Sequence, residues 1–292
     1  MPAVVLRDYV SMMKVRIAGL LLLVALSGFI ATRGAAVGWS ALGSLLVAGF
    51  LASTGSSVVN AYIDRDIDEL MDRTRGRPLP MHRIQPPEKA LVFGGALITA
   101  ALAIAWFLNN PLTAGFIALG VATYLGVYTV GLKRRSESNI VIGGFAGSCP
   151  ALAGSAAASG GVSLAAVLIA LLVFLWTPGH FWALAYRQKA DYRRAGLPML
   201  PAVRTDSTAV RAIAGSSILV AIVALTFGLT NAFGLAYLVV AAAAAAGLVV
   251  VTWRFSAHPN PDTAWTGYKY SSAYLGALLI GIVVDSILRF PL

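Results

Sequence analysis

The chain has 292 residues, of which 58% are hydrophobic and only 12% are charged, and its mean hydropathy is +0.79. Soluble domains carry about 25% charged residues, so this composition excludes a soluble protein and indicates an integral membrane protein. A net charge of +10 would favour a nucleic-acid partner for a soluble domain, but in a membrane protein it directs attention to the loops, and no nucleic acid is expected. The single cysteine, Cys149, excludes an internal disulfide and a cysteine-based metal cluster.

Apolar stretches long enough to span a bilayer, which takes about 20 helical residues, recur along the whole chain. The segment before the first of them is too short and too mixed in charge for a transit peptide, so we expect the first stretch to be a retained span. The nine predicted spans are 17–35, 41–61, 89–108, 111–131, 139–158, 163–185, 210–229, 232–253 and 269–288.

Charged residues gather on one side of these spans. With the N-terminus in the cytoplasm, the cytoplasmic segments hold 20 of the 22 basic residues, all but Arg33 and Arg289, and 11 of the 12 acids, all but Asp285. The positive-inside rule therefore predicts a multi-pass protein of the cell (inner) membrane with a cytoplasmic N-terminus and an odd number of spans. The candidate chemistry faces the cytoplasm, on the two longest loops, 62–88 and 186–209.

Asn60, Asp64 and Asp68 follow one another at four-residue steps at the end of the second predicted span. Four residues turn about 40° past one full helical turn, so these side chains stack along one helix face. Two carboxylates at that spacing repel each other, more so beside hydrocarbon, and a positive charge is expected between them. Mg²⁺ fits best, because it takes one or two carboxylates together with water and phosphate oxygens. Asn60 offers a carbonyl ligand or holds a bound water.

Basic residues follow these acids in the same loop. Arg73 and Arg77 present planar guanidinium groups that match phosphate oxygens. Acids for a metal followed by bases for phosphate predict a diphosphate site at the membrane surface. The alternative is a hydrated, mixed-charge loop. Lys133, two loops later, is either a topology anchor or part of the same face.

The second long loop begins on the sixth predicted span, where Trp176 and His180 lie among aromatic residues. A lone histidine inside an apolar span is a packed structural residue, a proton acceptor near neutral pH or a ligand of a metal-bearing substrate. Further along, Asp191 is a candidate for a second metal position and Lys189 for a phosphate or carboxylate contact. Near the last span, Tyr268 is interpreted as an interfacial anchor.

The chain resembles the UbiA superfamily of intramembrane prenyltransferases. The family's Asp-rich motif is an Asn with two acids at four-residue steps, followed by Arg-Thr-x-x-Arg-Pro-Leu. The matching residues are Asn60, Asp64, Asp68, Arg73, Thr74, Arg77, Pro78 and Leu79.

Further motifs are similar to one branch of this superfamily, the protoheme IX farnesyltransferases or haem O synthases. They cover nearly the whole chain and are more specific than the Asp-rich motif. They are Asp8-Tyr9, Lys14-Val15-Arg16, Tyr128-Thr129, Leu132-Lys133-Arg134, Asn139-Ile140-Val141-Ile142-Gly143-Gly144, Trp176, Pro178, His180-Phe181-Trp182, Asp191-Tyr192, Ala195-Gly196, Pro198-Met199-Leu200-Pro201, Ser271 and Tyr274-Leu275.

The resemblance implies one domain over residues 1–292, with nine transmembrane helices around a central cavity. It implies Mg²⁺-dependent transfer of a farnesyl group from farnesyl diphosphate to a vinyl group of haem b, beside membrane lipid, with a haem-modifying enzyme or terminal oxidase as an expected partner. The implied catalytic residues and metal ligands are Asn60, Asp64, Asp68 and Asp191. The implied diphosphate ligands are Arg73, Arg77, Lys133 and Lys189, and the implied haem contacts are His180 and Trp176.

The chain departs from the family pattern at three places. Asp191 has no acid four residues before or after it, because Arg187 and Ala195 stand there, which leaves the second metal position open. His82 replaces the usual glycine, and Val15 replaces the proline of Lys-Pro-Arg. Two other functions are weighed: a UbiA enzyme with an aromatic or quinone-precursor acceptor, and a non-catalytic haem or isoprenoid carrier or transporter, which would need no paired acids.

Overall fold

The computed structural model describes residues 2–33 and 38–289, and over these residues the regular structure is helical. Within this part of the chain, nine helices are long and apolar enough to cross a membrane, which confirms the predicted architecture. They are α2 (Val15–Arg33), α3 (Trp39–Ile63), α5 with η1 (Glu88–Ile104, Ala105–Asn109), α6 with η2 (Pro111–Ala122, Thr123–Leu132), α7 with α8 (Asn139–Gly143, Phe145–Ser159), α9 (Leu164–Arg187), α12 with η3 (Asp206–Thr226, Phe227–Leu229), α13 (Leu235–Ala257) and α14 (Pro261–Arg289).

The predicted spans and the observed helices differ most at the last span. Residues 34 and 35 of the first predicted span lie outside the described residues. The last helix begins at Pro261, eight residues before the predicted start. The side chain of Asn260 caps it, accepting hydrogen bonds from the backbone N–H groups of Asp262 and Thr263 at 2.9 and 3.0 Å. Hydropathy alone misses these first two turns, because they are polar.

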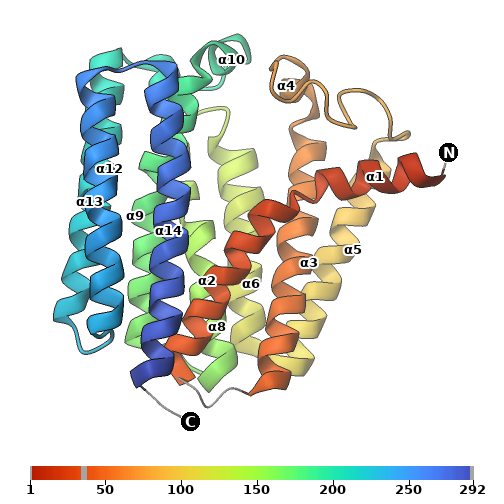
Figure 1. Ribbon diagram of the computed structural model, residues 1–292. Helices are drawn as coiled ribbons and strands as arrows, with labels where there is room; N and C mark the ends of the chain where they lie inside the picture. The colour runs from red at the N-terminus through yellow and green to blue at the C-terminus, as the bar shows by residue number, and fades with distance from the viewer. Residues whose placement is uncertain (1, 34–37, 290–292) are drawn as a thin grey trace.

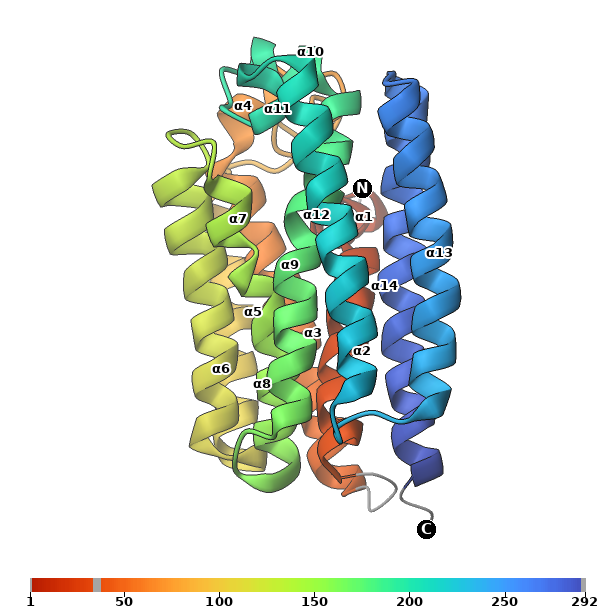
Figure 2. The same cartoon turned by 90° about the vertical axis from the view of Figure 1, so that its left-hand side faces the viewer.

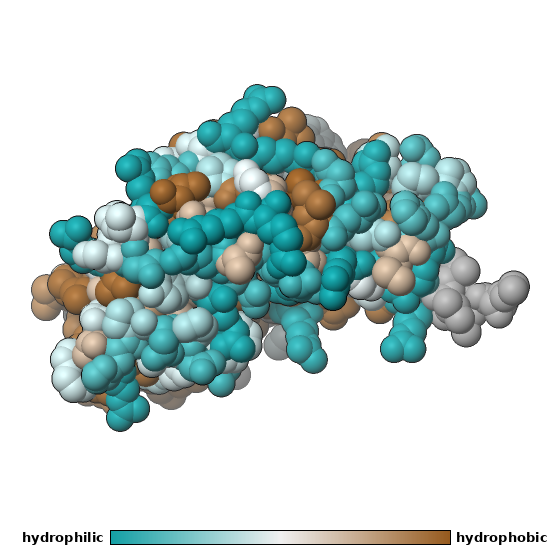
Figure 3. All heavy atoms as spheres, turned by 90° about the horizontal axis from the view of Figure 1, so that it is seen from above, coloured by the Kyte–Doolittle hydropathy of each residue, from teal (hydrophilic) through white to brown (hydrophobic). Residues whose placement is uncertain are grey.

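Four short helices lie outside the spans, and all are at one end of the bundle. They are α1 (Pro2–Met12), α4 (Arg65–Glu69), α10 (Lys189–Arg194) and α11 (Leu200–Val203). Figures 1 and 2 show the long helices running side by side, with α4, α10 and α11 at the upper end and the last described turn of α14 at the lower end. Seen from above, hydrophilic residues cover most of this end (Figure 3). We call it the loop end.

Helices α2 and α8 approach each other closely at two glycines. A Cβ atom on Gly28 would overlap the backbone of Ala151, and one on Gly154 would overlap the backbone of Ala25. Both glycines are therefore required by backbone contact, as in membrane bundles in which small residues let helices approach.

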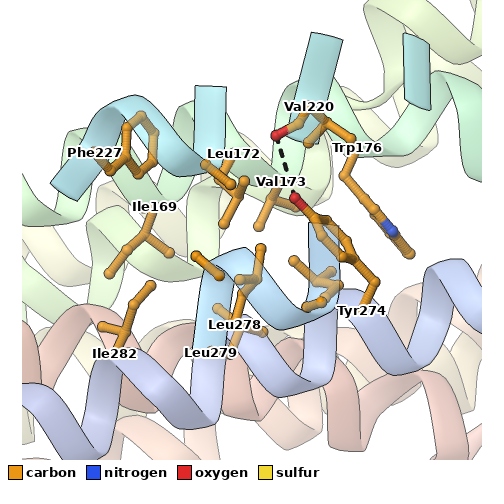
Figure 4. Close-up of a cluster of buried hydrophobic side chains, with 14 of the residues drawn as sticks. Ile169, Leu172, Val173, Trp176, Val220, Phe227, Tyr274, Leu278, Leu279 and Ile282 are labelled. Carbon is orange, nitrogen blue, oxygen red and sulfur yellow. Dashed lines mark hydrogen bonds between the residues drawn. The ribbon is translucent and has the colours of Figure 1, made fainter. Parts of the chain in front are cut away.

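The largest core cluster lies between α9, α12, α13 and α14 (Figure 4). Ile169 and Leu172 of α9 face Leu278 and Leu279 of α14, and all four side chains are fully buried. Tyr274 also points into this cluster, and its hydroxyl donates to the carbonyl oxygen of Val220 at 3.2 Å. The cluster fixes α9 against α14, and both helices carry residues of the site described below.

The one acid predicted on the far side of the membrane has a structural partner there. Asp285 is 2% exposed, and its carboxylate accepts from the backbone N–H groups of Gly234 and Tyr237, at 2.7 and 3.2 Å, at the start of α13. Its other neighbour is Arg289, at 3.9 Å. Asp285 thus supplies an N-terminal cap to α13 from a different helix.

The glycine contact gives a stability test. We expect Gly28→Val to lower the unfolding temperature in detergent, because α2 and α8 must separate to admit the side chain; overpacking costs about 1–3 kcal/mol. Gly19→Val on the same helix is the matched control, because a Cβ there meets nothing within 4 Å. Equal unfolding temperatures for the two variants in a thermal scan would contradict the contact.

Candidate active site

Asn60, Asp64 and Asp68 lie where α3 passes into α4. The helix is interrupted at Asp64, yet the hydrogen-bond pattern continues: Asp64 N–H donates to Asn60 O and Asp68 N–H to Asp64 O, both at 2.9 Å. The amide of Asn60 also donates to Asp64 Oδ2 at 2.7 Å. The three side chains are 4%, 1% and 4% exposed. The structure therefore brings all three predicted residues together in a buried position.

Each carboxylate is neutralised by a basic side chain. Lys133 Nζ donates to Asp64 Oδ2, and Arg77 Nη1 donates to Asp68 Oδ2 at 2.7 Å. The second oxygen of Asp64, Oδ1, is buried and accepts no hydrogen bond from the described residues. Arg77 and Lys133, both predicted phosphate ligands, thus lie beside the predicted metal ligands.

A third cation, Lys14, reaches the same cluster from the turn between α1 and α2. Its Nζ donates to Asn60 Oδ1 at 3.0 Å. Burial, and then repulsion from Arg77 and Lys133, lowers the pKa of Lys14 to about 7. Attraction to the two carboxylates does not offset these effects. Three basic side chains therefore converge on the two carboxylates, an arrangement that suits an anionic ligand, whose charge favours the protonated form of Lys14.

The loop that carries Arg77 is held by its own backbone and by Thr74. The fully buried Thr74 hydroxyl donates to the carbonyl oxygen of Asp68 at 2.9 Å, and Arg77 N–H donates to Thr74 O at 2.9 Å. These bonds fold residues 68–77 into a tight turn, so that Arg77 points back toward Asp68. This explains why the motif places a threonine between the acids and the second arginine.

Lys133 owes its position to a π-helix. In η2 the hydrogen bonds span five residues: Lys133 N–H donates to Tyr128 O at 2.7 Å, and the Thr129 hydroxyl donates to Tyr124 O at 2.7 Å. Thr129 also accepts from the Asn60 amide at 3.2 Å. The wider turn places Thr129 and Lys133 on the side that faces α3. π-Helical segments are rare and frequently lie at functional sites, and nothing in the sequence indicated this one.

The second loop meets the first through Asp191. This 5% exposed carboxylate accepts from Arg73 N–H at 3.3 Å and is paired with Arg194, which also donates to Asp72 at 2.8 Å. The Arg73 side chain lies near Tyr192, where its charge acts against the rise in the pKa of the buried phenol. Asp191 and Arg73 therefore join the two loops, as their predicted shared site requires.

Lys189 is placed differently. Its amine pairs with Asp206 at the start of α12 and lies 5.8 Å from the ring centre of Tyr186. This pairing does not involve the carboxylates of the cluster. Its contact with a diphosphate stays a prediction.

His180 lies in a column of aromatic rings between α9 and α14. Its ring stacks on Trp176 with a centroid distance of 4.1 Å and on Tyr268 at 4.3 Å. His180 is 6% exposed, and its Nδ1 atom is buried without a hydrogen-bond partner among the described residues. The Trp176 indole N–H donates to Ser271 O at 2.9 Å, which orients the column. Tyr268, interpreted from sequence as an anchor, is thus part of a site.

Arg73 connects the aromatic column to the charged cluster. It interacts electrostatically with Tyr268 and contacts Tyr192, while its backbone is bound to Asp191. Tyr192 is buried, which raises the pKa of its phenol, and Arg73 opposes the rise. The column and the cluster are therefore neighbouring parts of one site.

The donor set fits Mg²⁺. It consists of oxygens. Asp64 Oδ1 is buried, accepts no hydrogen bond from the described residues and has Arg134 4.0 Å away, while Asp64 Oδ2 and Asp68 Oδ2 pair with Lys133 and Arg77. In the described ranges no three His, Cys, Asp or Glu side chains gather as a metal site. Mg²⁺ takes one or two carboxylates and completes its coordination with water and phosphate. Ligation by Asp191 and by Asn60 stays a prediction.

The comparison with protein families gives a match over most of the chain. The model of the UbiA prenyltransferase family matches residues 21–273. The chain belongs to the UbiA prenyltransferase family. A relative from Sulfolobus acidocaldarius, called protoheme IX farnesyltransferase, is 43% identical over 282 residues, which are 96% of each chain.

Solved structures share the fold at low sequence identity. A digeranylgeranylglyceryl phosphate synthase matches 97% of this chain and 99% of its own, with a TM-score of 0.78 and 19% identity. A UbiA homologue from Archaeoglobus fulgidus bound to DMAPP and Mg²⁺ matches 95% and 99%, with a TM-score of 0.68 and 17% identity. The nine-helix fold is therefore that of the family. The central cavity stays a prediction for this chain.

The paired charges predict linked binding of metal and diphosphate. A divalent ion alone must displace Lys133 and Arg77 from the carboxylates, whereas pyrophosphate offers both cations new partners. We use Mn²⁺ as the probe and measure its binding by electron paramagnetic resonance. We expect its Kd to be at least tenfold lower when pyrophosphate is present, which corresponds to a coupling free energy of about 1.4 kcal/mol.

A matched pair of variants tests the assignment of this linkage to the buried carboxylates. Asp68→Asn should abolish it, whereas Asp66→Asn should retain it, because Asp66 is exposed and paired with Arg134. The same Mn²⁺ affinity with and without pyrophosphate in the unchanged protein would contradict the linkage.

Proposed function

We propose that this protein transfers the farnesyl group of farnesyl diphosphate to a vinyl group of haem b, giving haem O and diphosphate. The observation that carries the proposal is the buried pair Asp64 and Asp68 with its surrounding cations, next to an unpartnered histidine in an aromatic column. The first part fits a metal-bound diphosphate, and the second fits a flat, metal-bearing acceptor. The name of the Sulfolobus acidocaldarius relative supports the same reaction.

On the donor side, the buried residues act on the leaving group. Asn60, Asp64 and Asp68 would hold Mg²⁺, and the bound ion supplies charge that stabilises the departing diphosphate. Arg77 and Lys133 move from the carboxylates to phosphate oxygens, where their charge offsets the negative charge that develops as the allylic carbon–oxygen bond breaks. Arg73, whose backbone N–H is bound by Asp191 of the second loop, would reach the same oxygens from the first loop.

On the acceptor side, the column orients the haem. His180 offers an unpartnered nitrogen, Nδ1, to the iron or to a polar group of the porphyrin, and Trp176 offers a flat stacking surface. The apolar wall keeps water from the electron-poor allylic carbon until the vinyl group attacks. A water molecule then adds to the cationic carbon left on the former vinyl group and loses a proton, which completes the hydroxyethylfarnesyl side chain.

We also propose how the protein is oriented in the membrane and which proteins receive its product. The loop end lies on the cytoplasmic side of a cell membrane, because the basic residues gather there. Residues 1–292 form one catalytic domain, with the functional loops at 62–88 and 186–209. The product passes to a haem-modifying enzyme or to a terminal oxidase under assembly.

Loss of one buried carboxylate tests the enzyme. Purified protein with haem b, farnesyl diphosphate and Mg²⁺ should form a more hydrophobic haem, detected by chromatography. Asp64→Ala should lower the rate at least about 100-fold, because charge stabilisation of the leaving group is lost. Asp66→Ala, two residues away and exposed, should keep its rate. Unchanged turnover in Asp64→Ala would remove the proposed chemistry.

The histidine separates the two halves of the site. His180→Ala should weaken the haem absorbance shift at least about tenfold while leaving pyrophosphate affinity unchanged, because only the aromatic column is altered. His82→Ala is the control, since His82 is exposed in the first loop. If His180→Ala changes neither affinity, His180 is a packing residue only.

A further inference from the structure

Lys14 has a backbone conformation that side chains seldom adopt. Its φ is +49°, in the left-handed region, and it is one of two non-glycine residues with positive φ among those described. Such conformations persist where the surrounding structure enforces them and are found at ligand-binding sites more often than elsewhere. The turn directs Lys14 inward, so that its amine reaches Asn60 at 3.0 Å.

The structure that enforces this turn is α1, which lies across the loop end (Figure 1). The buried carboxylate of Asp8 pairs with Arg83 at 3.5 Å, and the Tyr9 ring meets Phe93 edge-on at 5.0 Å. Met12 is buried in a cluster that includes Leu79. These contacts attach α1 to the loop that follows the Asp-rich motif, and so fix the position from which Lys14 enters the site.

Lys14 enters a cluster that already has two cations. Arg77 and Lys133 repel it, and Asp64 and Asp68 attract it. Asp64 and Asp68 already pair with Lys133 and Arg77, and Arg134 lies 4.0 Å from Asp64 Oδ1. Lys14 is therefore not needed to neutralise the acids. A diphosphate, with several negative oxygens, is a ligand that three converging cations match.

We propose that Lys14, delivered by α1, is a third cation that binds the diphosphate, alongside Arg77 and Lys133. Its ammonium group exchanges the Asn60 amide oxygen for a phosphate oxygen, which frees that amide oxygen for the metal. The α1 helix is thereby a positioning element of the site. This inference rests on the diphosphate part of the proposed function and is independent of the acceptor.

The test measures the Kd for pyrophosphate by calorimetric titration of the full-length protein in detergent at a fixed Mg²⁺ concentration. Lys14→Gln keeps a hydrogen-bond donor for Asn60 and removes the charge, and it should raise the Kd at least tenfold. Lys14→Arg should stay within about threefold of the unchanged protein, because the charge is kept. Arg16→Gln, exposed and two residues away, is the matched control and should have no effect.

A second variant tests delivery by α1. Asp8→Ala removes the ion pair with Arg83 far from the phosphate, and it should weaken pyrophosphate binding only through Lys14. Its effect should therefore vanish in the Lys14→Gln background. If the effects of Asp8→Ala and Lys14→Gln on pyrophosphate affinity are additive, α1 does not position Lys14. This comparison remains valid even if Lys14→Gln lowers the unfolding temperature.

The outcomes separate this inference from the proposed reaction. Unchanged pyrophosphate affinity in Lys14→Gln would overturn it, since a lysine that only supports Asn60 predicts that result. Pyrophosphate binding that depends on Lys14, without any prenylated haem in the assay, would uphold the inference and reject the acceptor. Failure of the unchanged protein to bind pyrophosphate would reject both.

Discussion

The site depends on the compensation of two carboxylates, Asp64 and Asp68, that are shielded from water at the end of an apolar helix. Removing one partner of a buried ion pair costs about 3–5 kcal/mol, because the remaining charge is left uncompensated. Here the partners come from separate elements: Lys133 from the end of η2 and Arg77 from the loop after α4. Charge neutralisation therefore ties α3, η2 and the first loop into one arrangement.

The same cations serve stability and ligand binding. Lys133 and Arg77 stabilise the carboxylates in the protein alone, and in the proposed reaction they pass to the phosphate while Mg²⁺ takes the carboxylate oxygens. The exchange keeps the number of charged contacts nearly constant, so little charge has to be newly buried when the ligand enters. Asp191 is another buried carboxylate that links separate segments, because it binds the backbone of Arg73 in the first loop and the side chain of Arg194 in the second.

Much of this architecture follows from the sequence. Span positions depend on hydropathy, and the Asn60–Asp64–Asp68 face depends on helix periodicity, so both were predictable, except for the polar first eight residues of α14. The contributions of Thr129 and Lys14 were not, because a π-helix and a left-handed turn at a lysine have no sequence pattern of their own. Tyr268 was missed for another reason: a tyrosine near a span end is typical of an interfacial anchor, and only the packing of α14 on α9 brings it to His180.

The aromatic column also has a consequence for biogenesis. Trp176 and His180 belong to the sixth span, whereas Tyr268 lies on the ninth, so the ring that closes the column leaves the ribosome almost last. The charged cluster needs only segments up to Lys133 and is complete in a half-synthesised chain. The charged cluster can therefore form in the nascent protein before Tyr268 packs against His180 and closes the aromatic column.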